Sequence, residues 1–280
     1  MRKAIYSKTV RKYLVILLAL GWVITLIYFL PSLNKGRSKK TECIIKVAQP
    51  EGALINDAFI LLKCRQNYAA LAIFDKVLAS EPENLDALWG RAEILRRTRD
   101  FKTSEQLLNG VLKKNPGHIS SLISLSYIRY KDDKLDEAQQ LLNLVLKNKC
   151  SDRENEALAY MMLGTINSRR SAKSWVFNKI RYGTRIKSFF LKAGELAPGL
   201  SEVHLGLGTF YLLAPAIAGG DTSKAVEELE LAVKIAPTFA TANARLAQGY
   251  RKKGDLEKYN FYRQRAKEFD PGDEAVKENE

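Results

Sequence analysis

The sequence predicts an all-α solenoid, a stack of about six helix pairs, because two features recur along most of the chain. The first is a spacing: Pro82, Pro116 and Cys150 lie 34 residues apart, and so do Pro237 and Pro271. The second is a large apolar residue eight positions before four of these five (Arg263 stands before Pro271), with a small or β-branched residue five positions before all of them. A period of this length is typical of stacked helix–turn–helix repeats. Such arrays grow by adding units, so 280 residues are compatible with one elongated domain.

Repeat two, residues 83–116, shows the pattern most clearly. Leu88, Ala92 and Leu95 form one helical stripe at i, i+4 and i+7. The segment 99–101 then predicts a turn, and Leu108 begins the facing stripe. Small residues at the positions where paired helices meet are expected to let the helices approach each other, since interaxial distances are ~8–10 Å. The small residues at these positions are Ala92, Ser126, Gly164, Gly208 and Ala247 on the first helices, and Ala138 and Ala225 on the second.

These residues resemble the tetratricopeptide repeat (TPR) family. The sixth repeat carries Leu246-Ala247, Tyr250, Gly254-Asp255-Leu256, Ala266 and Pro271 at the spacing of that family. The fifth carries Leu207-Gly208, Tyr211, Gly220-Asp221, Ala225 and Pro237. The resemblance covers residues 51–273 and implies paired helices with a concave surface. It says almost nothing about function.

We divide the chain on this basis into an N-terminal region, a repeat array and a short tail. The N-terminal region comprises a basic tail (1–12), a transmembrane anchor (13–31) and a basic tether (32–50). The array (51–273) comprises units 51–82, 83–116, 117–150, 151–198 with an insertion, 199–237 with an insertion, and 238–271. Residues 274–280 are expected to form a charged tail.

The apolar run from Tyr13 to Leu30 predicts a single membrane-spanning helix. Its eighteen residues would span roughly 27 Å of helix, close to the thickness of the hydrocarbon layer. A cleaved signal peptide is the competing interpretation, but no small-x-small site follows the run. Basic residues flank both sides, so the positive-inside rule barely discriminates. The short basic N-tail favours placing the repeats on the non-cytoplasmic side of the membrane.

Charge and cysteine usage restrict the function classes. The net charge is +14, yet residues 1–50 hold ten Lys or Arg against one acid, and the array is far closer to neutral. A uniformly basic nucleic-acid binder would not have this distribution, so we do not expect nucleic acid to be the partner. Cys43, Cys64 and Cys150 are odd in number and far apart, which indicates three unpaired thiols rather than a disulfide framework or a zinc site.

Two segments depart from the 34-residue period. About ten residues are inserted between the helices of the fourth repeat, where basic and large apolar residues alternate. They are expected either to plug the widened gap or to contact an anionic partner. An anionic membrane surface or an acidic protein ranks above single-stranded nucleic acid as that partner. The candidate residues for this contact are Arg170, Lys173, Trp175, Lys179, Arg181, Arg185 and Lys187.

The second departure is an apolar loop, Ala214–Gly220, in the fifth repeat. Pro215 cannot continue a helix, Gly219-Gly220 permits positive φ, and Asp221 is placed to cap the next helix. The loop resembles a feature of bacterial periplasmic TPR proteins associated with TRAP-type solute transporters. It is expected either to cover an apolar gap or to lie near a small-solute site.

The first helices of a TPR array line its concave surface, and here they carry aromatic and charged side chains. Aromatic residues beside arginine on a concave face suit peptide binding, whereas an ordinary solvated face is the alternative. The candidate partner-binding residues are Trp89, Glu93, Arg96, Arg97, Tyr127, Tyr130, Lys131 and Arg169. TPR proteins that bind chaperone tails carry a clamp of Lys and Asn residues on this face, which binds a carboxylate. The candidate positions of this sequence do not show that clamp.

The sequence contains no constellation typical of catalysis. His118 and His204 are the only histidines, and neither lies in a metal-ligand or nucleophile motif. We therefore expect a non-enzymatic protein without a cofactor, a membrane-anchored TPR scaffold that binds one or more proteins. The alternatives are pairing of two arrays as a homo-oligomer, and an accessory component of a solute transport or envelope assembly.

Overall fold

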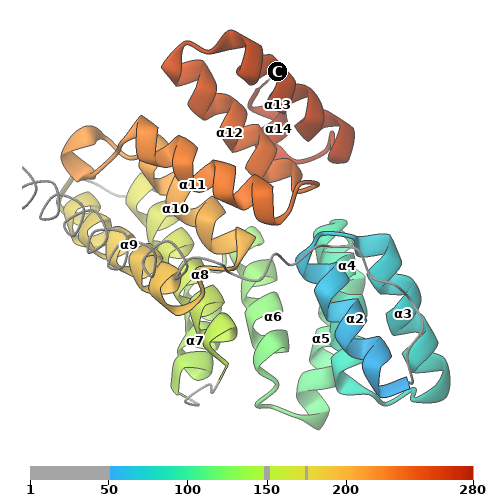
Figure 1. The fold of residues 1–280 in the computed structure, drawn as a ribbon. Helices are drawn as coiled ribbons and strands as arrows, with labels where there is room; N and C mark the ends of the chain where they lie inside the picture. Colours follow the sequence, from blue (N-terminus) through green and yellow to red (C-terminus); the bar gives the residue numbers. More distant parts are fainter. Residues whose placement is uncertain (1–50, 148–151, 174–175, 280) are drawn as a thin grey trace, which may run out of the picture. The chain divides into compact units, whose positions relative to one another are not determined.

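The computed structural model describes residues 51–147, 152–173 and 176–279. Within these ranges the chain is entirely helical, with no strand, which confirms the all-α helical-repeat fold (Figure 1). The helices are α2 (Glu51–Lys63), α3 (Asn67–Ser80), α4 (Leu85–Arg97), α5 (Phe101–Lys114), α6 (Ile119–Lys131), α7 (Leu135–Lys147), α8 (Arg153–Lys173), α9 (Val176–Leu196), α10 (Ser201–Leu213), the short 3₁₀ helix η1 (Ala216–Ala218), α11 (Thr222–Ile235), α12 (Ala240–Lys253), α13 (Leu256–Phe269) and α14 (Glu274–Lys277).

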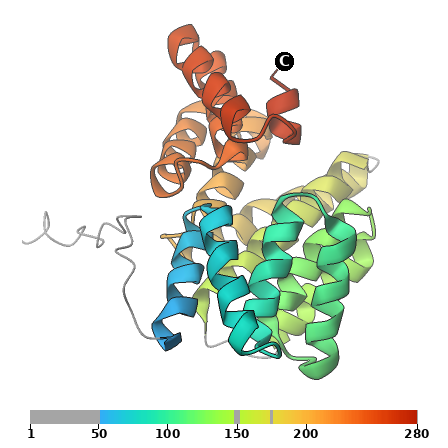
Figure 2. The ribbon, with the colours of Figure 1, turned by 90° about the vertical axis from the view of Figure 1, so that its right-hand side faces the viewer.

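Consecutive helices form hairpins that stack on their neighbours, as the two views show (Figures 1 and 2). Side-chain caps mark where many helices begin. Asn84, Asp100 and Asp255 each accept a hydrogen bond from the backbone N–H three residues later. Each such bond satisfies one of the free N–H groups of a first helical turn, and losing one costs about 1 kcal/mol.

Small residues sit where the helices of a pair touch. A Cβ added at Gly208 on α10 would lie 2.5 Å from Leu229 on α11, so the two helices meet there without room for a side chain. Gly164 on α8 lies against the Phe190 ring on α9 in the same way. Buried Ser104 on α5 donates a hydrogen bond to the Ala92 carbonyl on α4 at 2.8 Å. The pairing register predicted from the period is therefore present at these contacts.

The fourth repeat differs from the expectation of an inserted loop. Its two helices, α8 and α9, are each 21 residues long, whereas those of the second repeat have 13 and 14. The additional residues thus lengthen both helices within the described range. The alternation of basic and apolar residues that suggested a loop has the spacing of an amphipathic helix instead.

The loop of the fifth repeat follows the expected backbone chemistry. Pro215 ends α10, Gly219 adopts φ +95°, and Asp221 caps α11. A Cβ on Gly220 would lie 1.8 Å from the Ala214 carbonyl oxygen, so only glycine fits there. Ile217, at the tip, is 99% exposed.

The C-terminal residues are not a free charged tail. α14 buries Ala275 and Val276 against α12, and the following Asn279 donates hydrogen bonds to the Ala244 and Ala275 carbonyl oxygens. The polar residues around these two apolar ones concealed the short capping helix in the sequence.

Two expectations concern the N-terminal region and the cysteines. The predicted membrane anchor lies outside the described residues, and none of the helices described here is both long and apolar enough to cross a bilayer. Cys64 is disulfide-bonded, so the prediction of three unpaired thiols is wrong. Sequence spacing concealed this bond because cysteines far apart along the chain can still meet in the fold.

Candidate functional site

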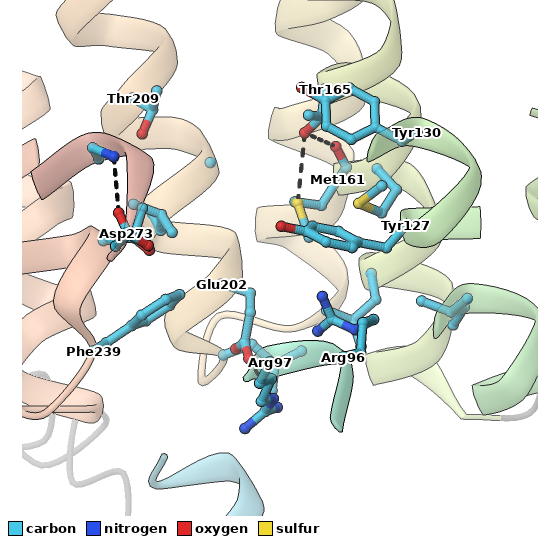
Figure 3. A pocket seen from close by; sticks show the side chains of 18 of the residues that line it. Arg96, Arg97, Tyr127, Tyr130, Met161, Thr165, Glu202, Thr209, Phe239 and Asp273 are labelled. Atoms are coloured by element: carbon cyan, nitrogen blue, oxygen red, sulfur yellow. Dashed lines mark hydrogen bonds and ion pairs between the residues drawn. The ribbon is translucent and has the colours of Figure 1, made fainter. Parts of the chain in front are cut away.

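A cavity of about 2750 Å³ is lined mainly by the first helices of the repeats and by the turns that follow them. Figure 3 shows Tyr127 and Tyr130 on one side of it and Phe239 and Asp273 on the other. All eight candidate partner-binding residues lie on its lining, drawn from α4, α6 and α8: Trp89, Glu93, Arg96, Arg97, Tyr127, Tyr130, Lys131 and Arg169. The concave arrangement expected from the sequence therefore brings these side chains together.

Stacked aromatic and guanidinium groups form one wall. The Arg96 guanidinium lies 4.1 Å from the centroid of the Tyr127 ring, and the Arg169 guanidinium 4.6 Å from that of Tyr130. The two tyrosine rings lie 6.2 Å apart. Arg169 also donates a hydrogen bond to the Tyr130 carbonyl oxygen at 2.9 Å. These contacts hold the four side chains in fixed orientations, so less side-chain entropy would be lost when a ligand binds.

Glu93 is the centre of a buried hydrogen-bond network. Its carboxylate accepts bonds from Arg96 Nε at 2.7 Å, Arg97 Nε at 2.8 Å and Ser124 Oγ at 2.8 Å. Ser124 in turn accepts a bond from Trp89 Nε1. Burial alone would raise the pKa of Glu93, but the two neighbouring arginines outweigh it and hold that pKa far below its usual range. Glu93 is thus ionised, and its carboxylate oxygens already accept hydrogen bonds from Arg96, Arg97 and Ser124.

Residues from distant repeats complete what we call the charge cluster: Arg65, Glu93, Arg96, Arg97 and Glu202. Arg65, in the α2–α3 turn, donates to Glu202 on α10 at 2.7 Å, and its guanidinium lies 3.8 Å from the centroid of the Phe239 ring. Arg97 lies 3.9 Å from the same Glu202. Burial, followed by the positive charge of Arg97, lowers the pKa of Arg65 to about 10. Arg65 and Arg97 outweigh the effect of burial on Glu202, so its pKa is below the usual value.

Two further ion pairs join early and late repeats along the cavity. Arg99, in the α4–α5 turn, forms a two-pronged pair with Asp270 at 2.7 and 2.8 Å. Lys131 on α6 pairs with Glu274 on α14. Together with Arg65–Glu202, these contacts connect the first three repeats to the fifth repeat, the sixth repeat and α14.

The period in the sequence did not identify Glu202, Phe239, Asp270 and Glu274. Periodicity describes each repeat and its neighbour, whereas these contacts depend on the rotation accumulated over several repeats. One signal was present: Arg65 and Arg99 occupy the turn position where the sixth repeat has Gly254. Arginine there adopts φ of 62° and 69°, a conformation that favours glycine.

The basic segment of the fourth repeat is partly engaged within the chain. Arg170 pairs with Asp136, and Lys173 with Asp133 at 2.5 Å, so both already have acidic partners. Arg185 and Lys187 are exposed on α9. Trp175 and the side chains of Lys179 and Arg181 lie outside the part of the chain that the structure describes.

Both histidines have structural roles. His118 caps α6 by accepting a bond from the Ser121 N–H. His204 is buried between Glu228 at 2.7 Å and the Pro198 carbonyl oxygen at 2.8 Å. Across the described ranges no three His, Cys, Asp or Glu side chains form a group that could hold a metal ion.

Comparison with known proteins agrees with the helical-repeat architecture. A model of the tetratricopeptide repeat family matches residues 65–125. A search of curated protein sequences finds no match. Human IFIT1, solved as a dimer with m7Gppp-AAAA, is similar at a TM-score of 0.57 and 19% identity, covering 89% of this chain and 57% of that one. The IFIT1 dimer with PPP-AAAA gives 0.56 and 20%, covering 78% and 50%.

Pseudomonas aeruginosa PilF gives a TM-score of 0.45 at 16% identity, covering 81% of this chain and 95% of that one. The chain spans about half the length of the IFIT1 chains, and at these identities the likeness concerns the fold alone. The family match and the observed helix pairs together support a helical array of the tetratricopeptide repeat type.

Proposed function

We propose that this chain is a membrane-anchored helical-repeat scaffold that binds a segment of another protein in its cavity. The observation that carries this proposal is the convergence of eight aromatic, arginine, lysine and glutamate side chains from three repeats on one cavity lining. Tyrosine, tryptophan and arginine are the residues most enriched where binding energy concentrates in protein interfaces.

The size of the cavity favours a protein segment over a small solute. Small-molecule sites usually measure about 300–1,000 Å³, well below the 2750 Å³ found here. The balance of charge argues against a polyphosphate ligand, because the lining residues include nine Lys or Arg and eight Asp or Glu. A nucleic-acid site requires a clear positive excess.

The anchoring part of the proposal is supported by the apolar run from Tyr13 to Leu30. The disulfide at Cys64 favours placing the repeats on a non-cytoplasmic side, since disulfides persist in oxidising compartments. Extraction of membranes with alkaline carbonate tests the anchor, and a reporter fused after Glu280 tests the orientation. Release of the chain into the soluble fraction would contradict anchoring.

Quantitative co-purification from detergent tests the binding part. The full-length chain should retain a stoichiometric protein, and Tyr127→Ala should reduce it several-fold because truncation removes the ring beneath Arg96. Lys102→Ala on α5, away from the cavity, is the matched control. Equal recovery by both variants, or a bound small molecule in place of a protein, would contradict the proposal.

A further inference from the structure

The charge cluster contains one positive charge in excess. Its three guanidinium groups, from Arg65, Arg96 and Arg97, face only two carboxylates, from Glu93 and Glu202. These five are the charged groups closest to one another at this point of the cavity, from the α2–α3 turn, α4 and α10. Each arginine has a carboxylate neighbour, but the cluster as a whole keeps a net positive charge, and an uncompensated charge in a buried setting is costly.

A second observation points to the same place. The Nε–H of Arg65 is buried and has no hydrogen-bond acceptor among the described residues. Nearly all buried donors in folded proteins are paired, so an orphaned one needs an explanation. Arg65 also holds a left-handed backbone conformation, with φ of 62°, that an arginine adopts only at a cost. The excess charge of the cluster and the unpaired Nε–H of Arg65 therefore lie at the same point of the cavity.

Three large apolar residues that line the cavity are also exposed. These are Tyr68, Leu213 and Ile217, with 86%, 57% and 99% of their surface exposed, and we call them the apolar rim. Large apolar side chains exposed at a concave site commonly mark a surface that a partner covers. A ligand in the cavity can therefore contact both exposed apolar groups and the excess positive charge of the cluster.

We infer that the segment bound in the cavity is acidic and apolar, and that one side-chain carboxylate of this segment pairs with Arg65 at the charge cluster while flanking apolar side chains cover the apolar rim. This inference rests on the proposed function and specifies the partner's chemistry. A carboxylate matches the planar fork of a guanidinium, supplies the missing negative charge and offers acceptors to its donors. A single carboxylate suffices, since the excess is one charge.

The test is a selection of random displayed peptides on the full-length chain in detergent, followed by titration with synthetic peptides. Selected peptides should carry an Asp or Glu among apolar residues. The wild-type chain should bind such a peptide about tenfold more tightly than its Asn or Gln analogue. The Arg65→Gln variant should bind both peptides equally, which is the signature of a direct pair in a double-mutant cycle.

Arg129→Gln is the control, because Arg129 on α6 pairs with Glu105 and Glu137 and does not line the cavity. It should preserve the preference for the acidic peptide. Comparing the two peptides on the wild-type chain needs no variant, so poor folding of Arg65→Gln leaves the test decisive.

The outcomes separate the inference from the proposed function. Peptides that bind equally well with and without their carboxylate, and that Tyr127→Ala weakens, would overturn the inference and leave the function standing. If Tyr127→Ala weakens the binding of none of the selected peptides, both the inference and the proposed function would be overturned. A single-stranded oligoribonucleotide that binds through Arg65, with no acidic peptide selected, would also overturn the inference.

Discussion

The helix-to-helix turns of the first two repeats and of the last repeat share one backbone conformation and carry different residues. Arg65 and Arg99 adopt φ of 62° and 69°, and Gly254, at the same position of the sixth repeat, adopts 80°. Glycine reaches this region freely, whereas other residues lose roughly 1–2 kcal/mol. The arginine side chains extend to Glu202 and Asp270 in distant repeats. A Cβ at Gly254 would meet no neighbour within 4 Å.

The difference separates two levels of organisation. Contacts within a helix pair, such as Gly208 against Leu229, fix each repeat, and a glycine turn is sufficient for that purpose. The arginine turns add contacts between early and late repeats around the cavity. Local stability and closure of the cavity should therefore respond to different substitutions, which the following predictions test in order of decreasing effect.

Glu93→Gln should have the largest effect on stability. It removes the carboxylate that compensates Arg96 and Arg97 in a buried setting, and breaking such a cluster costs about 3–5 kcal/mol. Urea unfolding monitored by circular dichroism measures the change. Glu105→Gln, which removes the partner of Arg129 outside the cavity, should cost less than about 1 kcal/mol. Equal costs would show that the charge cluster contributes no more to stability than an ion pair outside the cavity.

Gly208→Leu should destabilise the array through local packing. Its side chain has no room beside Leu229 and the Ala225 carbonyl oxygen, so we expect a loss of about 1–3 kcal/mol. Gly110→Leu, at an exposed helical position with no neighbour within 4 Å, is the control. It should leave stability unchanged or raise it by up to about 1 kcal/mol. A thermal midpoint of Gly208→Leu equal to that of wild type would disprove the helix pairing.

Exchanging the turn residues tests the comparison itself. Gly254→Ala should cost about 1 kcal/mol, because alanine gains no contact in return for the left-handed backbone. Arg99→Gly should be close to neutral, because relief of the backbone offsets the loss of a half-exposed ion pair. Thermal unfolding of both variants checks this. A large loss in Arg99→Gly would mean that the ion pair stabilises the fold itself.

The smallest effect concerns pH. The hydrogen bond from Arg99 lowers the pKa of Asp270 below its ordinary 3.8, so this pair contributes stability above that pH and loses it as the pH falls through the folded-state value. Below pH 3.8 the unfolding free energy of the wild type should therefore fall relative to that of Arg99→Gly. A difference that is constant with pH would contradict the pairing.

Much of the fold follows from the sequence alone because its determinants are local. The small residues Ala92, Gly164 and Gly208 meet their partner helices as their spacing predicted. The eight candidate residues lie on one lining for the same reason, since each occupies the inward face of a first helix.

What the sequence did not reveal depends on contacts between distant repeats. Glu202 and Phe239 contact Arg65 only because of the rotation accumulated over several helix pairs, which no residue spacing encodes.

Two other features were missed for local reasons. The inserted residues of the fourth repeat lengthen α8 and α9, because their alternation of basic and apolar residues also suits an amphipathic helix. The bond at Cys64 was missed because the spacing of cysteines carries no information on which of them meet.

The central claim is that the cavity beside Tyr127 holds a segment of another protein. Photo-crosslinking in living cells tests it directly, with a benzoylphenylalanine placed at position 127 and, as the control, at position 102 on the outer helix α5. We predict a discrete protein adduct from position 127 that position 102 does not give, and that Glu93→Gln weakens. Crosslinks that are equal at both positions, or absent from position 127, would contradict the account.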